Sequence, residues 1–193
     1  KVGAPTYAVT MALYNVDASH QPTGTALCST AFVASSLTTT ATWRAYRFAT
    51  GCDVSAGTEY ALVLSGNGGT STAKVTVSSS ASGGYNGGEA GFSVDGGLNW
   101  QTLTGQDLVF YEGQYPWYEM SSANNAAVPV YSQYWAAQTF TPARDHYLDQ
   151  VGICLYKAGS PSHTITVSVY STDNVHRPVG TALSSTRISP WSM

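Results

Sequence analysis

The chain contains one stretch of sequence twice, and this internal repeat limits its fold more than any other feature. The run KVGAPTYAVTMALYNVDASHQPTGTALCST at Lys1–Thr30 aligns without a gap to KAGSPSHTITVSVYSTDNVHRPVGTALSST at Lys157–Thr186. The two runs lie 156 residues apart, and about half of the aligned positions are identical. Chance does not produce such agreement, so we infer tandem modules with a period of about 156 residues.

The repeat is cut out of phase with the module. Two strand-like runs, Gln138–Pro142 and Leu148–Lys157, precede the second copy, and nothing equivalent precedes the first. We therefore divide the chain into a module at 1–113 that lacks its first strands, an aromatic-rich connector at 114–137, and the N-terminal part of the next module at 138–193. A missing strand leaves an open sheet edge and an uncovered core. Neither module is expected to close with the residues of this chain alone.

Two arrangements would supply the missing strands. The sequence is either a window on a long covalent array, or a subunit that exchanges strands head to tail with its neighbours. The array is favoured, because donation alone leaves a surplus that duplicates Lys1–Val33. In both cases the partners are adjacent modules or copies of the chain. The residues expected to lie on the shared strands are Gln138, Phe140, Leu148, Val151, Ile153 and Leu155.

Short runs of alternating apolar and polar residues predict β-strands throughout the chain. Tyr7–Asn15 and His163–Ser171 alternate cleanly, and Gly, Pro, Asn and Asp separate the runs. No window has a convincing helical period. The sequence therefore predicts an all-β, antiparallel two-sheet β-sandwich that is jelly-roll-like.

The composition is typical of secreted surface and fibre proteins. Charged residues make up only 10% of the chain, against roughly 25% in soluble domains, while Ser, Thr, Gly and Tyr are abundant. The net charge of −3 offers no basic surface for nucleic acid. No apolar run reaches the ~18 residues that a membrane-spanning helix needs. We expect an extracellular, cell-surface or virion-surface location.

One short motif has a recognisable pattern. Ser93, Asp95, Gly97 and Trp100 lie in the run SVDGGLNW, which resembles the Asp-box S-x-D-x-G-x-T-W with Asn99 in place of Thr. In families that carry the Asp-box, such as sialidases, it is a structural hairpin in which Asp caps the turn and Trp packs beneath it. The resemblance implies a structural hairpin here, and Asp-Gly has backbone reasons to occur in such turns.

The sequence offers little catalytic chemistry. It has no nucleophile elbow, no phosphate-binding glycine loop and no metal-ligand cluster. His20 and His176 occupy equivalent repeat positions and are interpreted as polar turn residues. Carboxylates occur singly, and although pairs could form in space, we predict that the chain is not an enzyme. The acidic residues considered are Glu59, Glu89, Asp107, Glu112 and Glu119.

No cofactor is expected. Calcium bound by Asp17 or Asp95 with loop carbonyls is the one metal site considered, because oxygen-rich turns suit that ion. Either Cys28 and Cys52 form a disulfide in an oxidising compartment, or all three cysteines, Cys28, Cys52 and Cys154, stay as separate buried thiols.

Aromatic side chains are concentrated in and beside the connector. Trp117, Tyr118, Tyr134 and Trp135 are expected to pack modules against each other. The same side chains could instead form a platform for sugars. This leaves a carbohydrate-binding or adhesive module array as the alternative function.

The order of segments resembles the secreted β-sandwich repeats of large bacterial and archaeal surface proteins and of some phage structural proteins. The matching pattern runs from QTFTP through LDQVGICLYKAGSP and TVSVYSTD to SVDGGLNW and DLVFYEG, and AGTEYALVLSG at Ala56–Gly66 is particularly typical. The resemblance implies tandem display on a surface or virion and brings no catalytic residues. The leading prediction is a structural extracellular protein, the repeating unit of a filament or surface array.

Overall fold

The computed structural model describes residues 5–113, 119–122, 125–158, 164–169, 171–172 and 178–179. Across these ranges the chain forms β-strands and one short 3-10 turn, η1(Ala34–Ser36), with no α-helix. Most strand pairs are antiparallel and they form two sheets. The predicted all-β, two-sheet antiparallel sandwich is confirmed, while its jelly-roll-like character and its tandem modules stay predictions.

The first sheet contains both copies of the repeated strand. Its strand order is β15-β16-β2-β1-β14-β4-β12-β6-β7. The bounds are β1(Ala8–Val16), β2(Pro22–Val33), β4(Tyr60–Gly66), β6(Ala90–Ser93), β7(Gln101–Leu103), β12(Trp135–Phe140), β14(Thr164–Val169), β15(Ser171–Thr172) and β16(Pro178–Val179).

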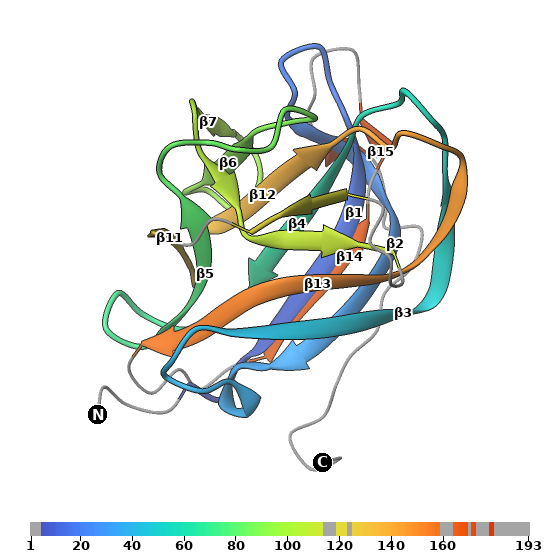
Figure 1. Ribbon diagram of the computed structural model, residues 1–193. Coiled ribbons are helices and arrows are strands. Elements are labelled where there is room, and N and C mark those ends of the chain that lie inside the picture. The colour runs from blue at the N-terminus through green and yellow to red at the C-terminus, as the bar shows by residue number, and fades with distance from the viewer. Residues whose placement is uncertain are drawn as a thin grey trace.

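The second sheet is organised around one long strand. In the order β10-β9-β13-β5-β11, β13 also pairs with β3, and β8 pairs with β5. Figure 1 shows β3 and β13 side by side, crossing the strands of the first sheet. The bounds are β3(Thr42–Val54), β5(Lys74–Ser80), β8(Asp107–Leu108), β9(Phe110–Glu112), β10(Glu119–Ser121), β11(Ala126–Val130) and β13(His146–Ala158).

The core contains large apolar side chains from both sheets, and each contributes roughly 1.5–3 kcal/mol through its burial. Tyr7, just before β1, adds a polar link, since its hydroxyl donates to the carbonyl of Val130 at 2.6 Å and accepts from the N–H of Val75. Burial raises the pKa of Tyr7 far above its ordinary value. Fully buried members of the core include Phe32, Leu62, Phe110, Phe140, Leu148 and Ile153.

A disulfide joins Cys28 on β2 to Cys52 on β3, with the two Cα atoms 5.6 Å apart. It therefore connects the two sheets covalently. Cys154 on β13 is a buried free thiol. Of the two alternatives left open by the sequence, the structure has the disulfide.

The connector expected at 114–137 is largely part of the sandwich. Residues 114–118, 123 and 124 lie outside the described residues, but β10, β11 and the start of β12 are sheet strands. Val128 and Val130 are buried, and Pro129 lies between them on β11, at the edge of its sheet. An edge strand tolerates Pro because its N–H is not needed by a second neighbour. The alternation of buried valines accounts for β11 as a strand of the sheet.

The strands expected to belong to the next module complete the first one. β12 lies between β4 and β6, while β13 pairs with β3 on one side and with β5 and β9 on the other. The structure therefore corrects the expectation that the first module cannot close within this chain. Because the modules repeat, β12 and β13 are equivalent to the strands that the first module lacks at its start. They can therefore pair with the edges that those missing strands would have occupied.

Candidate functional site

Both copies of the repeated strand, β1 and β14, pair with the same residues of β4. Val9 of β1 pairs with Gly66 of β4, and Ile165 of β14, its counterpart one period later, pairs with the same glycine. Thr10 and Thr166 pair likewise with Ser65. Against β2, Ala8 and Thr164 share the partner Val33. The two copies thus adopt one register.

β1 and β14 also pair with each other in parallel, with Met11 opposite Val167 and Leu13 opposite Val169. Both copies therefore lie together between β2 and β4, and β14 follows β13 in the chain. The disulfide distinguishes the copies, because Ser184 stands at the position equivalent to Cys28. Under oxidising conditions the first copy is covalently held through Cys52.

The six residues predicted on shared strands lie in β12 and β13 and are buried or half-buried. Gln138 is the informative one, because it is a buried amide that connects the sheets. Its Oε1 accepts from the N–H of Leu108 at 2.6 Å, and its Nε2 donates to Asp107 Oδ1 at 3.2 Å. A buried amide with unmet hydrogen bonds would be costly, so Gln138 fixes β12 against β8.

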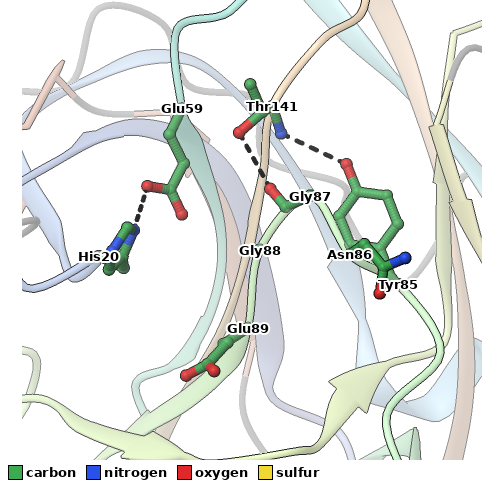
Figure 2. A pocket seen from close by; sticks show the side chains of 8 residues that line it. All are labelled: His20, Glu59, Tyr85, Asn86, Gly87, Gly88, Glu89 and Thr141. Atoms are coloured by element: carbon green, nitrogen blue, oxygen red, sulfur yellow. Dashed lines mark hydrogen bonds and ion pairs between the residues drawn. The ribbon is translucent and has the colours of Figure 1, made fainter.

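A polar cavity of about 750 Å³ lies at one end of the sandwich, and we call it the end pocket. Residues from four separate connections line it: the β1–β2 turn, the residue before β4, the β5–β6 loop and the residue after β12. Figure 2 shows these side chains surrounding a common space. The lining residues are His20, Glu59, Tyr85, Asn86, Gly87, Gly88, Glu89 and Thr141.

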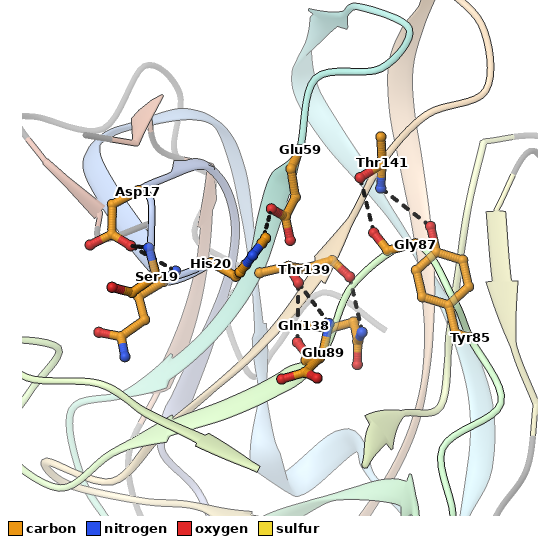
Figure 3. Close-up of polar contacts among 11 residues, drawn as sticks. Asp17, Ser19, His20, Glu59, Tyr85, Gly87, Glu89, Gln138, Thr139 and Thr141 are labelled. Carbon is orange, nitrogen blue, oxygen red and sulfur yellow. Dashed lines mark hydrogen bonds and ion pairs between the residues drawn. The ribbon is translucent and has the colours of Figure 1, made fainter. Parts of the chain in front are cut away.

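An Asp-anchored turn holds His20 at the pocket. The buried Asp17 accepts hydrogen bonds at Oδ1 from the N–H of Ser19 at 2.9 Å and of Gln21 at 3.1 Å (Figure 3). His20 itself has φ 59°, an uncommon conformation for a residue with a side chain. Its Nδ1 contacts Glu59 Oε2, so the imidazole and the carboxylate form one unit of the wall.

The opposite wall is fixed to β12. The N–H of Glu89 donates to Thr139 Oγ1 at 2.8 Å, and Thr141 Oγ1 donates to the carbonyl of Gly87 at 3.0 Å (Figure 3). The hydroxyl of Tyr85 accepts from the N–H of Thr141 at 3.3 Å. A Cβ on Gly88 would lie 2.0 Å from the carbonyl oxygen of Thr139, so only glycine permits this close approach.

Sequence reasoning identified Glu59, Glu89 and His20 as single residues but not as neighbours. They lie far apart in the chain, and only the closure of the sandwich brings their loops together. The one local signal was the DASHQPTG turn, which recurs as DNVHRPVG in the second copy. Of that second turn, residues 173–177 and 180 lie outside the described residues.

The Asp-box-like hairpin connects β6 to β7, and its polar atoms are used internally. Asp95 accepts from the N–H of Asn99 at 2.9 Å and from its Nδ2 at 2.6 Å, while Ser93 Oγ accepts from the N–H of Gly97 at 2.9 Å. The bonds from Asn99 and Ser93 lower the pKa of Asp95 to about 2. Trp100, just before β7, is buried in the core. Asn99 therefore serves where the motif has Thr.

The predicted aromatic platform is only partly described, since Trp117 and Tyr118 lie outside the described residues. Trp135 is half-buried and packs on Gly97, where an added Cβ would come within 2.5 Å of the indole. Tyr134 stacks on Tyr131 with ring centroids 4.5 Å apart. Tyr134 and Trp135 line an apolar hollow of about 260 Å³ beside Phe92 and Val128–Pro129.

Two of the other carboxylates, Glu112 and Asp107, are buried and bind groups of the protein itself. Glu112 Oε2 lies 2.8 Å from Nε2 of His146, and both side chains are buried. Asp107 is buried and accepts from the N–H of Tyr85 at 3.0 Å. Nothing is described of the Glu119 side chain. Among the described residues, no three His, Cys, Asp or Glu side chains are grouped as a metal site, and calcium at Asp17 or Asp95 stays a prediction.

Nor does any helix in the described ranges have the length and hydrophobicity needed to cross a membrane. In comparisons with known proteins, no family model, no curated protein and no solved structure matches the chain. The resemblance to surface and phage repeats accordingly stays a prediction.

Proposed function

We propose that this chain is the repeating unit of an extracellular filament or surface array, in which adjacent sequence copies complete one another's β-sandwiches. The observation that carries the proposal is the shared place beside β4, where β1 and β14 adopt the same register one period apart. A place that matches either copy can take the strand of its own module or of a neighbouring one.

The position of β12 and β13 supports the same function. Both strands follow the first module in sequence, yet they lie inside its sheets rather than at an edge. A sandwich built this way depends on sequence from the next period. Its stability is then linked to the continuity of the array, as in other repeat architectures.

The disulfide and the composition favour an extracellular location. Disulfides persist in oxidising compartments and are rare in the cytosol, and the Cys28–Cys52 bond joins the two sheets. With only 10% charged residues, the surface is suited to packing against further copies rather than to dispersal. The chemistry of the described residues supplies no separate argument for an enzyme.

Assembly of the full chain tests the proposal. Light scattering and negative-stain images should reveal regular polymers with an axial repeat of one sandwich, and the Cys28–Cys52 disulfide should slow exchange of the first copy. Reduction should therefore accelerate polymer growth. A monodisperse monomer at all concentrations, both oxidised and reduced, would contradict the proposal.

Two truncations test the equivalence of the copies. A chain without residues 1–33 and a chain without residues 159–193 each keep one copy of the repeated hairpin, so both should unfold cooperatively. The chain lacking both segments should not fold, because the place beside β4 stays empty. If removal of 1–33 alone abolishes folding, the second copy cannot replace the first.

A further inference from the structure

The end pocket has the features of a binding site, and the proposed role in a filament or array does not explain them. Its volume of about 750 Å³ falls within the range of roughly 300–1,000 Å³ found for small-molecule sites. Its walls come from four connections, which is how loops on a rigid sandwich usually build a site. We infer that this pocket binds an uncharged saccharide.

Hydrogen bonds within the protein hold the walls of the pocket. Thr139 and Thr141 bond to Glu89 and Gly87, which holds the β5–β6 loop against β12. Asp17 fixes the turn that presents His20 on the other side. A site formed in advance loses little conformational entropy on binding, so the polar groups at its surface can recognise a ligand efficiently.

The charges of the lining disfavour anions. Glu59 and Glu89 both line the pocket, and its lining includes no Lys or Arg from the part of the chain that the structure describes. A phosphate, a sulfate or an acidic sugar would lie beside two carboxylates, while the imidazole of His20 already pairs with Glu59. The described part of the chain also has no group of three His, Cys, Asp or Glu side chains that could hold a metal ion. The ligand must donate hydrogen bonds and carry no negative charge.

Sugar hydroxyl groups meet this requirement. A hydroxyl that donates to a carboxylate forms a charge-assisted hydrogen bond, which is stronger than a neutral one. Asn86 adds a carboxamide that both donates and accepts. Tyr85 adds an aromatic ring that packs at right angles to the ring of Phe110, with centroids 5.3 Å apart. A single protonated amine would use the carboxylates but leave most of the cavity unfilled.

The location differs from the one that the sequence suggested for sugars. Trp135 packs on the Asp-box-like hairpin, and Tyr134 stacks on Tyr131, so these two rings already have structural neighbours. The end pocket instead uses acidic and amide groups from connections between strands. If each period carries the site, an array multiplies weak single contacts into avidity.

The test uses the full 193-residue chain on a printed panel of neutral, amino and sialylated oligosaccharides. We expect selective binding of neutral members, followed by a measurable affinity in titration calorimetry for the best of them. Asn86→Ala and Glu89→Gln should each weaken that affinity about tenfold, the equivalent of one charged or bidentate hydrogen bond. Their melting temperatures should match that of the parent chain.

Asp53→Asn is the matched control, since Asp53 is an exposed carboxylate on β3 outside the pocket. It should bind like the parent chain. The inference is overturned if no neutral oligosaccharide binds in the millimolar range, if sialylated or amino members are preferred, or if Asn86→Ala and Glu89→Gln bind like Asp53→Asn. Binding is measured on the monomer, so its failure is distinguishable from a failure of assembly.

Discussion

Two turns in this molecule are held by an aspartate in the same way, but they present residues with different roles. In the Asp17–Gln21 turn and in the Asp-box-like hairpin, an aspartate accepts hydrogen bonds from the backbone N–H groups that follow it. After Asp95 the chain continues to Trp100, which is buried in the core. After Asp17 it continues to His20, whose side chain faces the end pocket beside Glu59.

The comparison shows that an Asp-anchored turn does not by itself indicate whether the residue that it presents stabilises the fold or lines a binding site. Its aspartate fixes the backbone in both places, and the residue that the turn presents decides the outcome. A buried tryptophan stabilises the fold, whereas an exposed histidine at φ 59° contributes polar atoms to a cavity. Substitutions at the two turns should therefore separate stability from binding.

The largest expected effect is at Asp17. Asp17→Ala removes a buried acceptor from two backbone N–H groups and should lower the free energy of unfolding by about 2 kcal/mol. It should also displace His20 and weaken any ligand of the end pocket. Chemical denaturation measures the first effect, with Asp53→Ala as an exposed control. Equal midpoints for the two variants would contradict the structural role of the Asp17 turn.

A smaller, pH-dependent effect is expected at Asp95. Its pKa of about 2 in the folded chain lies below the ordinary value of 3.8, so its stabilising contribution is present above pH 4 and disappears as the pH falls towards 2. The difference in unfolding free energy between the parent chain and Asp95→Ala should therefore shrink over that interval. A difference that stays constant from pH 5 to pH 2 would show that ionised Asp95 does not hold the turn.

The smallest effect on stability is expected at His20. Its side chain is 62% exposed, although that of its partner Glu59 is only 13% exposed, and ion pairs with one solvated member contribute little. His20→Ala should change the unfolding free energy by less than about 0.5 kcal/mol, while the amide signals of Ser19 and Gln21 keep their positions in NMR spectra. A larger loss would make the imidazole part of the fold rather than of the pocket.

Much of the fold was accessible from the sequence because its causes are local. The alternation in Tyr7–Asn15 predicted β1, and the SVDGGLNW run predicted a hairpin with Asp95 at its turn. The closure of the first module was not accessible, because a repeat offers β13 two equivalent partners and the sequence does not rank them. The division of the chain at 114–137 stays a prediction, and within that range the sequence analysis did not foresee the strand β11 with Val128 and Val130 buried.

The end pocket was not accessible for a different reason. Glu59, Tyr85 and Thr141 belong to three connections, and no spacing in the sequence relates one to another. Only the pairing of β12 with both β4 and β6 brings their ends together. Sites assembled from loop ends in this way depend on topology, whereas a turn such as DASHQPTG can be read from eight residues.

Val9 and Ile165 both pair with Gly66 of β4. This shared partner affects how a gene that encodes several periods can change in length. Wherever a chain carries further periods, the loss or gain of one whole period leaves every β4 with a neighbour of matching register. Recombination between copies would then alter the number of sandwiches without disturbing any of them. Insertion of a single residue within a strand would instead shift its side chains to the opposite face of the sheet.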